Sequence, residues 1–408
     1  MIDLAKKIIV KLSAKGYELI ECRAEIIKNL VARFTEEGPK DLSYLEDRGI
    51  GIRALKDGYW YFTVLTDPDI KTVDELLSKG IFNMKFKNRG QIQIKDMPIN
   101  NDNIQVKAKE TLLNLNPDKI SEVPLNIYND LKEKIKTNSK FIRAFDIFFN
   151  SNFKEEFFLN SEGSEINQRY PFQRLVISLT GLENGKRART VQSIGGPKGI
   201  EVFKENEKWN TYKLLDLLVK RVKTILSGRE PPQGDMTVVM DPSMTGTLIH
   251  EAFGHLCEAD LVFAGGAITP NMVGQEIAND KVTILDEPLN ENGGWVPYDQ
   301  EGTKSEQAIL VDNGILKEFM VDREYALLLN QLPKGNARAT NFHYPPIIRM
   351  RNTYLKQGDY SFEELIEDVD SGIYVEKFIG GQASLLGTFQ FSCQVGWLIE
   401  NGKITEPL

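Results

Sequence analysis

Two of the three histidines of this chain lie close together, and a glutamate directly follows the first of them. The segment reads His250-Glu251-Ala252-Phe253-Gly254-His255. Imidazole nitrogens are common metal ligands, and a neighbouring carboxylate can act as a general base. In the usual helical zinc motif, the two histidines stand at positions i and i+4, so that both rings project from one face. These residue types predict a metal site that carries its own proton acceptor.

The spacing of this pair is one residue longer than usual. On a regular helix with about 100° per residue, a ligand at i+5 lies about 140° from the first one, instead of about 40°. Both rings can face one ion only if the helix widens by one residue or ends near Gly254. Glycine eases either change because it has no Cβ. The alternative is a chance pair on a partly buried helix, but two of three histidines around a glutamate favour ligands.

Other residues could also act in a functional site, but the sequence supports such a role less strongly. His343 precedes two prolines, which is typical of local scaffolding. Arg338 could bind a substrate carboxylate through its forked donors or pair with a surface acid. Gly380-Gly381-Gln382 could let a peptide approach the backbone as an added strand, or could form a plain turn. Gly195-Gly196-Pro197-Lys198-Gly199 lacks the helix and final Ser or Thr of a phosphate-binding loop, so we interpret it as a turn. No substrate-binding residue is assigned.

The composition narrows the class of protein. A chain of 408 residues with 41% hydrophobic and 26% charged residues is long enough for two or three globular domains. The net charge of −8 argues against a nucleic-acid partner. We expect no membrane partner, since no apolar run could cross a bilayer, and the amino terminus does not resemble a signal peptide. Three cysteines predict no disulfide framework, and the expected location is cytoplasmic.

The elements that must position the pair follow from periodicity and turn signals. Asp57-Gly58 separates two β-rich runs and predicts a hairpin, and the charged segment from Lys107 to Lys136 predicts a largely helical stretch. A helix is expected from about Tyr212 to Leu226. After the linker 231–234, Met236–Met240 predicts a buried strand leading into the helix of the histidine pair.

The fold class that follows is α+β with several domains. We predict an amino-terminal α/β domain at 1–105 and a middle domain of strands and helices at 106–230. A β-rich domain at 231–408 is expected to carry the helix of the histidine pair. Asp241, with Pro242 after it, is expected to cap that helix.

Beyond the histidine pair, several blocks in this chain resemble those of the TldD/PmbA family, in its metal-bearing TldD-type branch. They are Gly49-Ile50-Gly51-Ile52-Arg53, Asn160-Ser161-Glu162-Gly163, Tyr298-Asp299-Gln300-Glu301-Gly302, Gly335-Asn336-Ala337-Arg338, Arg349-Met350-Arg351-Asn352-Thr353-Tyr354, Gly380-Gly381-Gln382 and Leu398-Ile399-Glu400-Asn401-Gly402-Lys403. The blocks occur in the order that the family shows. Together they are much more specific than any one of them.

The resemblance implies a Zn²⁺-dependent peptidase acting on flexible or unfolded peptides. His250 and His255 would bind the zinc, and Glu251 would act as the general base. It also implies a heteromer with a PmbA-type homologue that lacks the histidine motif; a homodimer is the other arrangement we expect. The alternative function is a non-catalytic subunit that captures peptides.

The third metal ligand is not identified. The resemblance implies a cysteine in a segment that would lie beyond Leu408. Within this chain, Cys393 and Cys257 are candidate substitutes, although each is more typical of a buried apolar residue. Glu258 and Asp260 offer carboxylates after the pair, in positions that are more often solvated.

Overall fold

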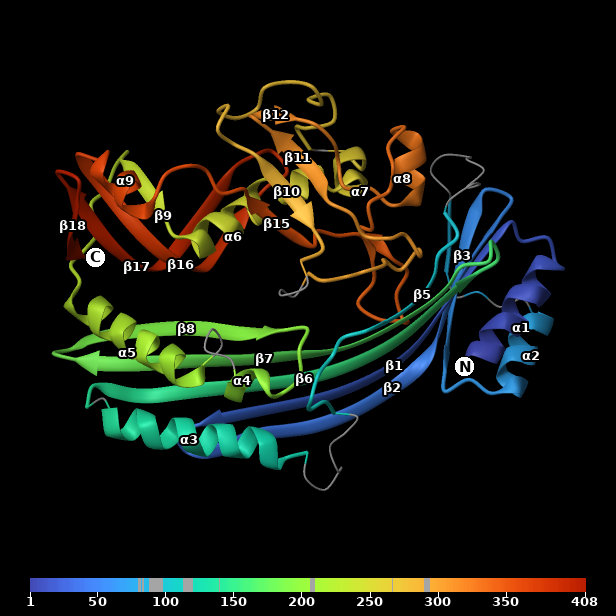
Figure 1. Ribbon diagram of the computed structural model, residues 1–408, viewed down its shortest axis with the longest axis horizontal. Helices are drawn as coiled ribbons and strands as arrows, with labels where there is room; N and C mark the ends of the chain where they lie inside the picture. Colours follow the sequence, from blue (N-terminus) through green and yellow to red (C-terminus); the bar gives the residue numbers. More distant parts are fainter. Residues whose placement is uncertain are drawn as a thin grey trace.

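Eight strands from the first half of the chain form one long, curved sheet (Figure 1). The computed structural model describes residues 1–79, 82, 84–87, 98–112, 120–138, 140–205, 210–265, 267–289 and 294–408. The strands are β1 (Leu19–Thr35), β2 (Gly38–Lys56), β3 (Tyr59–Thr66), β4 (Met84–Lys87), β5 (Asn101–Gln105), β6 (Ile142–Asn160), β7 (Glu165–Glu183) and β8 (Lys186–Gly196). Their order is β4-β3-β2-β1-β6-β7-β5, and β8 also pairs with β7.

Tight turns set the register of this sheet. Asp57 and Gly58 both have positive φ angles, of 51° and 72°, and join β2 to β3 in the predicted hairpin. Asn184 and Gly185 connect β7 to β8 in the same way. Positive φ at both central residues gives a turn whose twist matches that of the flanking strands. The hairpin prediction is therefore confirmed.

The two faces of the sheet have different partners. Along β1, the side chains of Ile20, Cys22 and Ala24 pack into the core formed with helices α1 (Ile2–Ser13) and α2 (Ile70–Lys79). Further along the same face, β1 packs in the core covered by α3 (Glu122–Asn138) and α5 (Thr211–Ser227). The alternating residues, beginning with Glu21, turn to the other face, because side chains alternate along a strand. That face meets the carboxyl-terminal part of the chain.

The helix predicted from Tyr212 to Leu226 is confirmed as α5. Asn210 caps its first turn by accepting from the backbone N–H of Tyr212 at 2.9 Å, and the helix ends before Gly228. The prediction of a largely helical stretch from Lys107 to Lys136 was wrong in its first part. Residues 107–112 are not helical, 113–119 lie outside the described residues, and α3 begins only at Glu122. The charged composition had suggested a longer surface helix than the chain forms.

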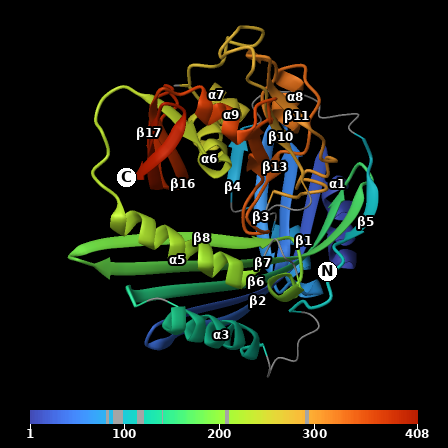
Figure 2. The same cartoon turned by 60° about the vertical axis from the view of Figure 1, so that its left-hand side comes forward.

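The carboxyl-terminal part contains three further sheets and several short helices (Figures 1 and 2). One sheet has the order β18-β17-β16-β9, another β12-β11-β10-β15, and β13 pairs with β14. Their bounds are β9 (Thr237–Met240), β10 (Ile284–Glu287), β11 (Ala308–Asp312), β12 (Ile315–Leu316), β13 (Ala337–Arg338), β14 (Ile347–Ile348), β15 (Asn352–Leu355), β16 (Ser371–Ala383), β17 (Phe389–Glu400) and β18 (Lys403–Pro407). The helices are α4 (Val202–Glu205), which precedes this part, and then α6 (Pro242–Ala252), η2 (Gly254–Cys257), α7 (Ala259–Phe263), α8 (Arg323–Leu328) and α9 (Phe362–Glu367). The mixed α+β fold with several sheets is as predicted.

One strand of this part is less buried than the sequence indicated. The run from Met236 to Met240 was expected to be a buried strand, but β9 begins at Thr237 and lies at the edge of its sheet, paired in parallel with β16. Val238 is 44% exposed. An apolar run of this length is found both in central strands and in edge strands, so its composition alone could not separate the two.

A layer of buried charges joins the long sheet to the carboxyl-terminal part. The guanidinium of Arg53 contacts the carboxylates of Glu21, at 2.6 Å, and Glu301, at 2.5 Å. Arg323 donates to Glu21 and, at 2.6 Å, to Glu162. We call Glu21, Arg53, Glu301 and Arg323 the buried joint.

Glycines allow the two parts to approach closely beside this joint. A Cβ on Gly49 would stand 2.2 Å from the ring of Phe342, and one on Gly51 would stand 2.4 Å from the Phe342 carbonyl oxygen. Strands from both sides of the predicted 105/106 boundary belong to the long sheet, because β1 pairs with β6. The division into three domains stays a prediction.

Candidate metal centre

The helix that carries the histidine pair begins where the sequence predicted. Asp241 accepts a hydrogen bond from the backbone N–H of Met244 at 2.6 Å, and Pro242 occupies the first turn, where its missing N–H costs no helical bond. The helix lies between β15 and β16 and contacts both strands. It delivers His250 and Glu251 at its carboxyl-terminal end.

The chain solves the five-residue spacing by ending the helix. The α-helix stops at Ala252, Phe253 leaves helical geometry with φ −131° and ψ −43°, and a 3₁₀ turn follows at Gly254–Cys257. Of the two deformations that could bring both rings together, a widened turn or an ended helix, the structure shows the second. A side chain at residue 254 would displace Met350, because a Cβ on Gly254 would stand 2.2 Å from the sulfur of Met350.

The break in the helix brings His250, Glu251 and His255 together. The two imidazole centroids are 5.3 Å apart, and the rings are inclined at 81°. One candidate ligand atom from each of the three residues lies within 4.8 Å of the others. The carboxylate of Glu251 approaches Nε2 of His255 at 3.7 Å. The sequence-predicted group therefore has the proximity that a shared metal ion requires.

Glu258 fixes the orientation of the second histidine. It is fully buried, and its carboxylate accepts a hydrogen bond from Nδ1 of His255 at 2.7 Å. Its other oxygen accepts from the backbone N–H of Met350 at 3.3 Å. With Nδ1 protonated in this way, Nε2 keeps its lone pair for a metal, as in carboxylate–histidine–metal arrangements. The expectation that Glu258 is solvated was wrong, because the 3₁₀ turn carries it inward.

The two histidines have different electrostatic surroundings. Burial lowers the pKa of His250, and the neighbouring imidazole of His255 lowers it further. The hydrogen bond that His255 donates to Glu258 raises the pKa of His255, although burial acts in the opposite direction. His250 is thereby favoured in the neutral form that binds metals.

A pocket of about 260 Å³ opens beside the group. It is lined by Glu251, His255, Leu256 and Leu261, and by residues 383–385 at the end of β16 and just after it. The site is half-open, because the side chain of Glu251 is 39% exposed and that of His255 is 32% exposed. Water and a substrate segment therefore have access to the donor atoms.

Neither cysteine considered as a third ligand joins the group in the described part of the chain. Cys257 is fully buried in the apolar core, and burial raises the pKa of its thiol well above the ordinary value. Cys393 pairs with Phe378 across β16 and β17, next to Lys377, whose backbone N–H donates to Asp241 at 3.3 Å. Asp241 caps the start of α6, and the nine residues from there to His250 cover about 13 Å of helix, so Cys393 lies at the end of the helix that is far from the histidine pair.

Other candidates from the sequence lie outside the group. The Asp260 carboxylate accepts a hydrogen bond from the backbone N–H of Leu261 at 3.0 Å. His343 contacts Asp47 of β2 through Nε2 at 3.0 Å. His343 thus holds a loop against the long sheet, in keeping with a scaffolding role.

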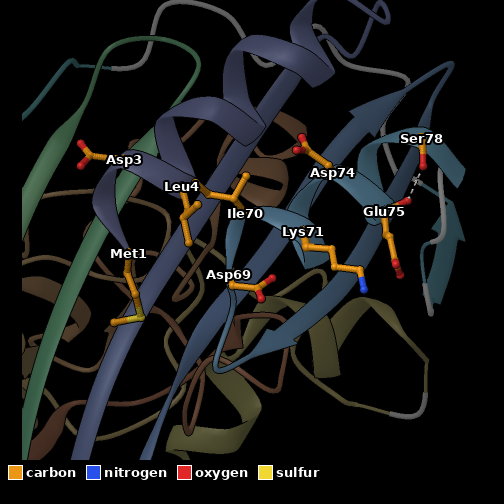
Figure 3. Close-up of a pocket in the computed structure, with 9 residues that line it drawn as sticks. All are labelled: Met1, Asp3, Leu4, Asp69, Ile70, Lys71, Asp74, Glu75 and Ser78. Atoms are coloured by element: carbon orange, nitrogen blue, oxygen red, sulfur yellow. Dashed lines mark hydrogen bonds between the residues drawn. The ribbon is translucent and has the colours of Figure 1, made fainter.

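Two further pockets are separate from the histidine pair. Arg338 donates to the carbonyl of Met350 at 3.0 Å and lines a pocket of about 440 Å³ with Arg349. A pocket of about 1100 Å³ lies between α1 and α2, and Figure 3 shows the carboxylates of Asp3, Asp69 and Asp74 around it. Neither pocket includes a residue of the candidate group.

The sequence predicted neither the contact of Glu258 with His255 nor the packing of Met350 beside the site. Glu258 stands three residues after His255, a spacing that brings side chains together on a helical turn and could have indicated the contact. Met350, which packs on Gly254, comes from a distant segment and gives no local signal. The loop of Ser384 and Leu385 is likewise brought to the site by the β16–β17 hairpin alone.

This arrangement of two imidazoles and a carboxylate, with one imidazole held by a buried acid, is typical of a metal-dependent hydrolase. Comparison with known proteins gives the family. Residues 20–83 match domain 1 of the PmbA/TldA metallopeptidases, and residues 233–408 match their carboxyl-terminal domain. A metalloprotease of Methanothermobacter thermautotrophicus is 32% identical, with 88% of this chain and 77% of that protein aligned. A zinc metalloprotease TldD homolog of Saccharolobus solfataricus is 31% identical, over 98% and 87%. The chain belongs to the PmbA/TldD metallopeptidase family.

Solved structures support the fold. A putative modulator of DNA gyrase from Bacteroides thetaiotaomicron aligns over all of this chain and 88% of its own length, with a TM-score of 0.77 and 20% identity. TldE of Thermococcus kodakarensis gives 0.77 at 16% identity, over 99% and 89% of the two chains. Across the residues that the structure describes, no helix is both long and apolar enough to cross a membrane.

Proposed function

We propose that this chain is a zinc-dependent peptidase that cleaves flexible or unfolded peptides. The observation that carries the proposal is the convergence of His250, Glu251 and His255 within 4.8 Å, which the end of α6 makes possible. The names of the relatives as metalloproteases, one of them a zinc metalloprotease, support the same reading.

The residues present fit a zinc ion. His250 and His255 offer neutral imidazole nitrogens, which zinc binds well, and Glu258 holds the second ring by its other nitrogen. Zinc at these two residues would act as a Lewis acid and lower the pKa of a bound water to about 7.

Glu251 has the position of a general base. It directly follows the first histidine, and its carboxylate lies 3.7 Å from Nε2 of the second, on the open side of the site. From there it can accept a proton from the attacking water and return it to the leaving amine. Its partial exposure lets it meet a substrate without a rearrangement of the core.

The course of β16 favours an extended peptide as substrate. β9 pairs with β16 only at residues 372–375. Beyond that point, no strand of the described chain pairs with the same edge of β16, and the strand continues through Gly380 and Gly381 to the residues that line the pocket. Unpaired backbone groups at a strand edge can bind a peptide by adding a strand, with little dependence on its sequence.

The partner of the chain is part of the proposal. We infer that it works as a heteromer with a PmbA-type homologue or as a homodimer. The solved TldE structure shows that a related chain adopts the same fold, which makes a paired arrangement of two similar chains reasonable.

The proposal is tested by elemental analysis of the purified chain beside His255→Ala, followed by hydrolysis of an unstructured protein with and without a chelator. We expect bound zinc in the wild type, loss of it in the variant, and cleavage that the chelator stops and added zinc restores. An Asp260→Asn variant, changed outside the donor group, should keep both zinc and activity.

The alternative function would give a different result. A non-catalytic subunit would bind the unstructured protein without cleaving it, and the chelator would not change the binding. A wild-type chain that stays free of zinc after zinc is supplied, and that shows this binding, would overturn the peptidase proposal.

A further inference from the structure

The pocket of about 440 Å³ that contains Arg338 and Arg349 has, among the described residues that line it, no acidic side chain. The rest of its lining is uncharged and consists of Ala339, Thr340, Tyr344, Pro345, Ile347 and Met350. A concave site with a few charged groups among apolar ones is the usual form of a ligand-binding pocket. The charge of this pocket favours an anionic ligand.

The short ribbon of β13 and β14 places both arginines on one face. Arg338 lies opposite Ile347, and the pairing continues through a backbone hydrogen bond of Arg349. Side chains alternate along a strand and opposite residues share a face, so Arg338, Ile347 and Arg349 project together. Ala337 and Ile348 point the other way and are buried. Diagonal neighbours on two strands are about 7–8 Å apart, within reach of two long side chains.

Arg351, in the same segment, shows how this fold holds an arginine that only stabilises it. Its Nε donates to Asp286 at 2.8 Å, its other two nitrogens donate to backbone carbonyls, and its side chain is fully buried. Arg338 differs, because in the described part of the chain it forms no ion pair and donates to one carbonyl, that of Met350 at 3.0 Å. Its remaining donors are available to a ligand.

The surroundings make the positive charge of the pocket costly when it is empty. Burial lowers the pKa of the Arg338 guanidinium, because the charged form loses water, and the like charge of Arg349 adds to this effect. Arg349 itself is 48% exposed and approaches the carboxylate of Glu258 only to 4.0 Å, which is too long for a hydrogen bond. An anion between the two guanidinium groups would offset both the lost hydration and the repulsion.

The pocket adjoins the metal centre. One oxygen of Glu258 is 2.7 Å from Nδ1 of His255, and the other is 4.0 Å from the guanidinium of Arg349. Met350 lines the pocket and also lies against Gly254, between the two histidines. An extended peptide advances about 3.3–3.6 Å per residue. A peptide held in the pocket therefore has only a few residues between its anchored group and the metal centre.

We propose that this pocket binds a carboxylate group of the peptide through the guanidinium groups of Arg338 and Arg349. A guanidinium offers planar, forked donors that match the two oxygens of a carboxylate. The carboxyl terminus of a peptide and an Asp or Glu side chain present the same group, so either can supply it. The peptide as its source rests on the proposed function, whereas the affinity of the pocket for a carboxylate does not.

Equilibrium binding of labelled peptides, followed by fluorescence polarisation in a chloride buffer, tests the proposal. The full chain carries Glu251→Gln and is supplied with zinc, so that the peptides stay intact. Short unstructured peptides of small uncharged residues are compared in two pairs: free carboxyl terminus against amide, and internal Glu against internal Gln with both ends blocked. At least one carboxylate peptide should bind about tenfold more tightly than its neutral partner, and the pair that shows this identifies the source.

Variants of the two arginines locate the preference. Arg338→Gln and Arg349→Gln should each remove most of it and leave the binding of neutral peptides unchanged. Arg338→Lys keeps the charge without the fork and should retain only part. Arg33→Gln, at an exposed arginine of β1, is the matched control and should keep the full preference. Thermal melts show whether each variant folds, and if Arg338→Gln does not, the exposed Arg349 decides the question.

Equal binding of the carboxylate and neutral peptides would overturn the proposal, whether or not inorganic phosphate binds to the chain. A preference that survives both substitutions to Gln would do the same, because the carboxylate would then bind elsewhere. The peptidase assay on the unaltered chain is a separate measurement. A carboxylate preference without cleavage would leave the pocket assigned and count only against the proposed function, and cleavage without the preference would count only against the pocket.

Discussion

The metal centre and the buried joint use charged residues in opposite ways. At the centre, the side chains of Glu251 and His255 are 39% and 32% exposed, and their contact with each other is loose. In the joint, the Arg53 and Glu301 side chains are 8% and 2% exposed and in direct contact. Burial by itself favours neutral Arg53, yet Glu21 and Glu301 raise the pKa of its guanidinium. The partly exposed charges of the metal centre can reach water and substrate, whereas the buried charges of the joint hold the long sheet and the carboxyl-terminal part together.

The largest effect should come from Glu251→Gln at the metal centre. Loss of a general base lowers the rate by about 10²- to 10⁴-fold. Because the Glu251 side chain is partly exposed and its contact with His255 is loose, the free energy of unfolding should change by less than about 0.5 kcal/mol. Steady-state kinetics and urea unfolding on the same preparation measure both. Full activity would end the assignment of Glu251 as the base.

Arg53→Ala should have the opposite effect to Glu251→Gln: a large loss of stability without damage to the metal centre. It leaves the buried Glu301 without its cation and Glu21 with Arg323 alone, which costs about 3–5 kcal/mol of stability. The zinc content of the molecules that remain folded should be unchanged, because the substitution does not touch the donor group. Urea unfolding measures the loss. A change below about 1 kcal/mol would show that the joint does not stabilise the fold.

Glu258→Gln connects the two regions, since this carboxylate is buried like the joint and acts on the centre. Its weaker acceptor should orient His255 less firmly and lower zinc affinity about 10- to 100-fold, as for other partners of metal-binding histidines. Competition with a chelating dye measures the affinity, with Asp260→Asn as control. Equal affinities in the three proteins would exclude the positioning role.

The smallest effect is expected at an exposed ion pair. Lys7 of α1 contacts Asp74 of α2 at 2.7 Å, with 33% and 54% of the side chains exposed. Lys7→Ala should change the free energy of unfolding by less than about 1 kcal/mol, because water screens such pairs. The difference from Arg53→Ala in urea unfolding then measures what burial adds to a charge pair. Similar losses of unfolding free energy in Lys7→Ala and Arg53→Ala would show that burial adds nothing to the stabilisation by a charge pair.

The sequence predicted local features better than long-range contacts. The cap at Asp241, the hairpin at Asp57-Gly58 and the helix expected from Tyr212 to Leu226 depend on neighbouring residues, and all are confirmed. The histidine pair was found for the same reason. The buried joint was not predicted, since an Arg or Glu within a strand gives no sign that a distant segment covers it.

The family blocks acquire a physical meaning in the structure. Glu301 lies in one block and Arg53 in another, and they meet in the joint although 248 residues separate them. Gly49 and Gly51 in the Arg53 block admit Phe342. These residues hold the long sheet against the carboxyl-terminal part. A single sequence does not show that contact, because the residues that meet there are far apart along the chain.

The end of α6 at Ala252 has a consequence for how such proteins are found. Because the chain leaves the helix before its second histidine, His250 and His255 are one residue too far apart for a search built on the i, i+4 pattern. Deleting one residue to restore that pattern would shift the 3₁₀ turn that holds His255 and ends at Glu258. A three-dimensional template of two imidazoles and a buried acid would recover relatives that a text pattern passes over.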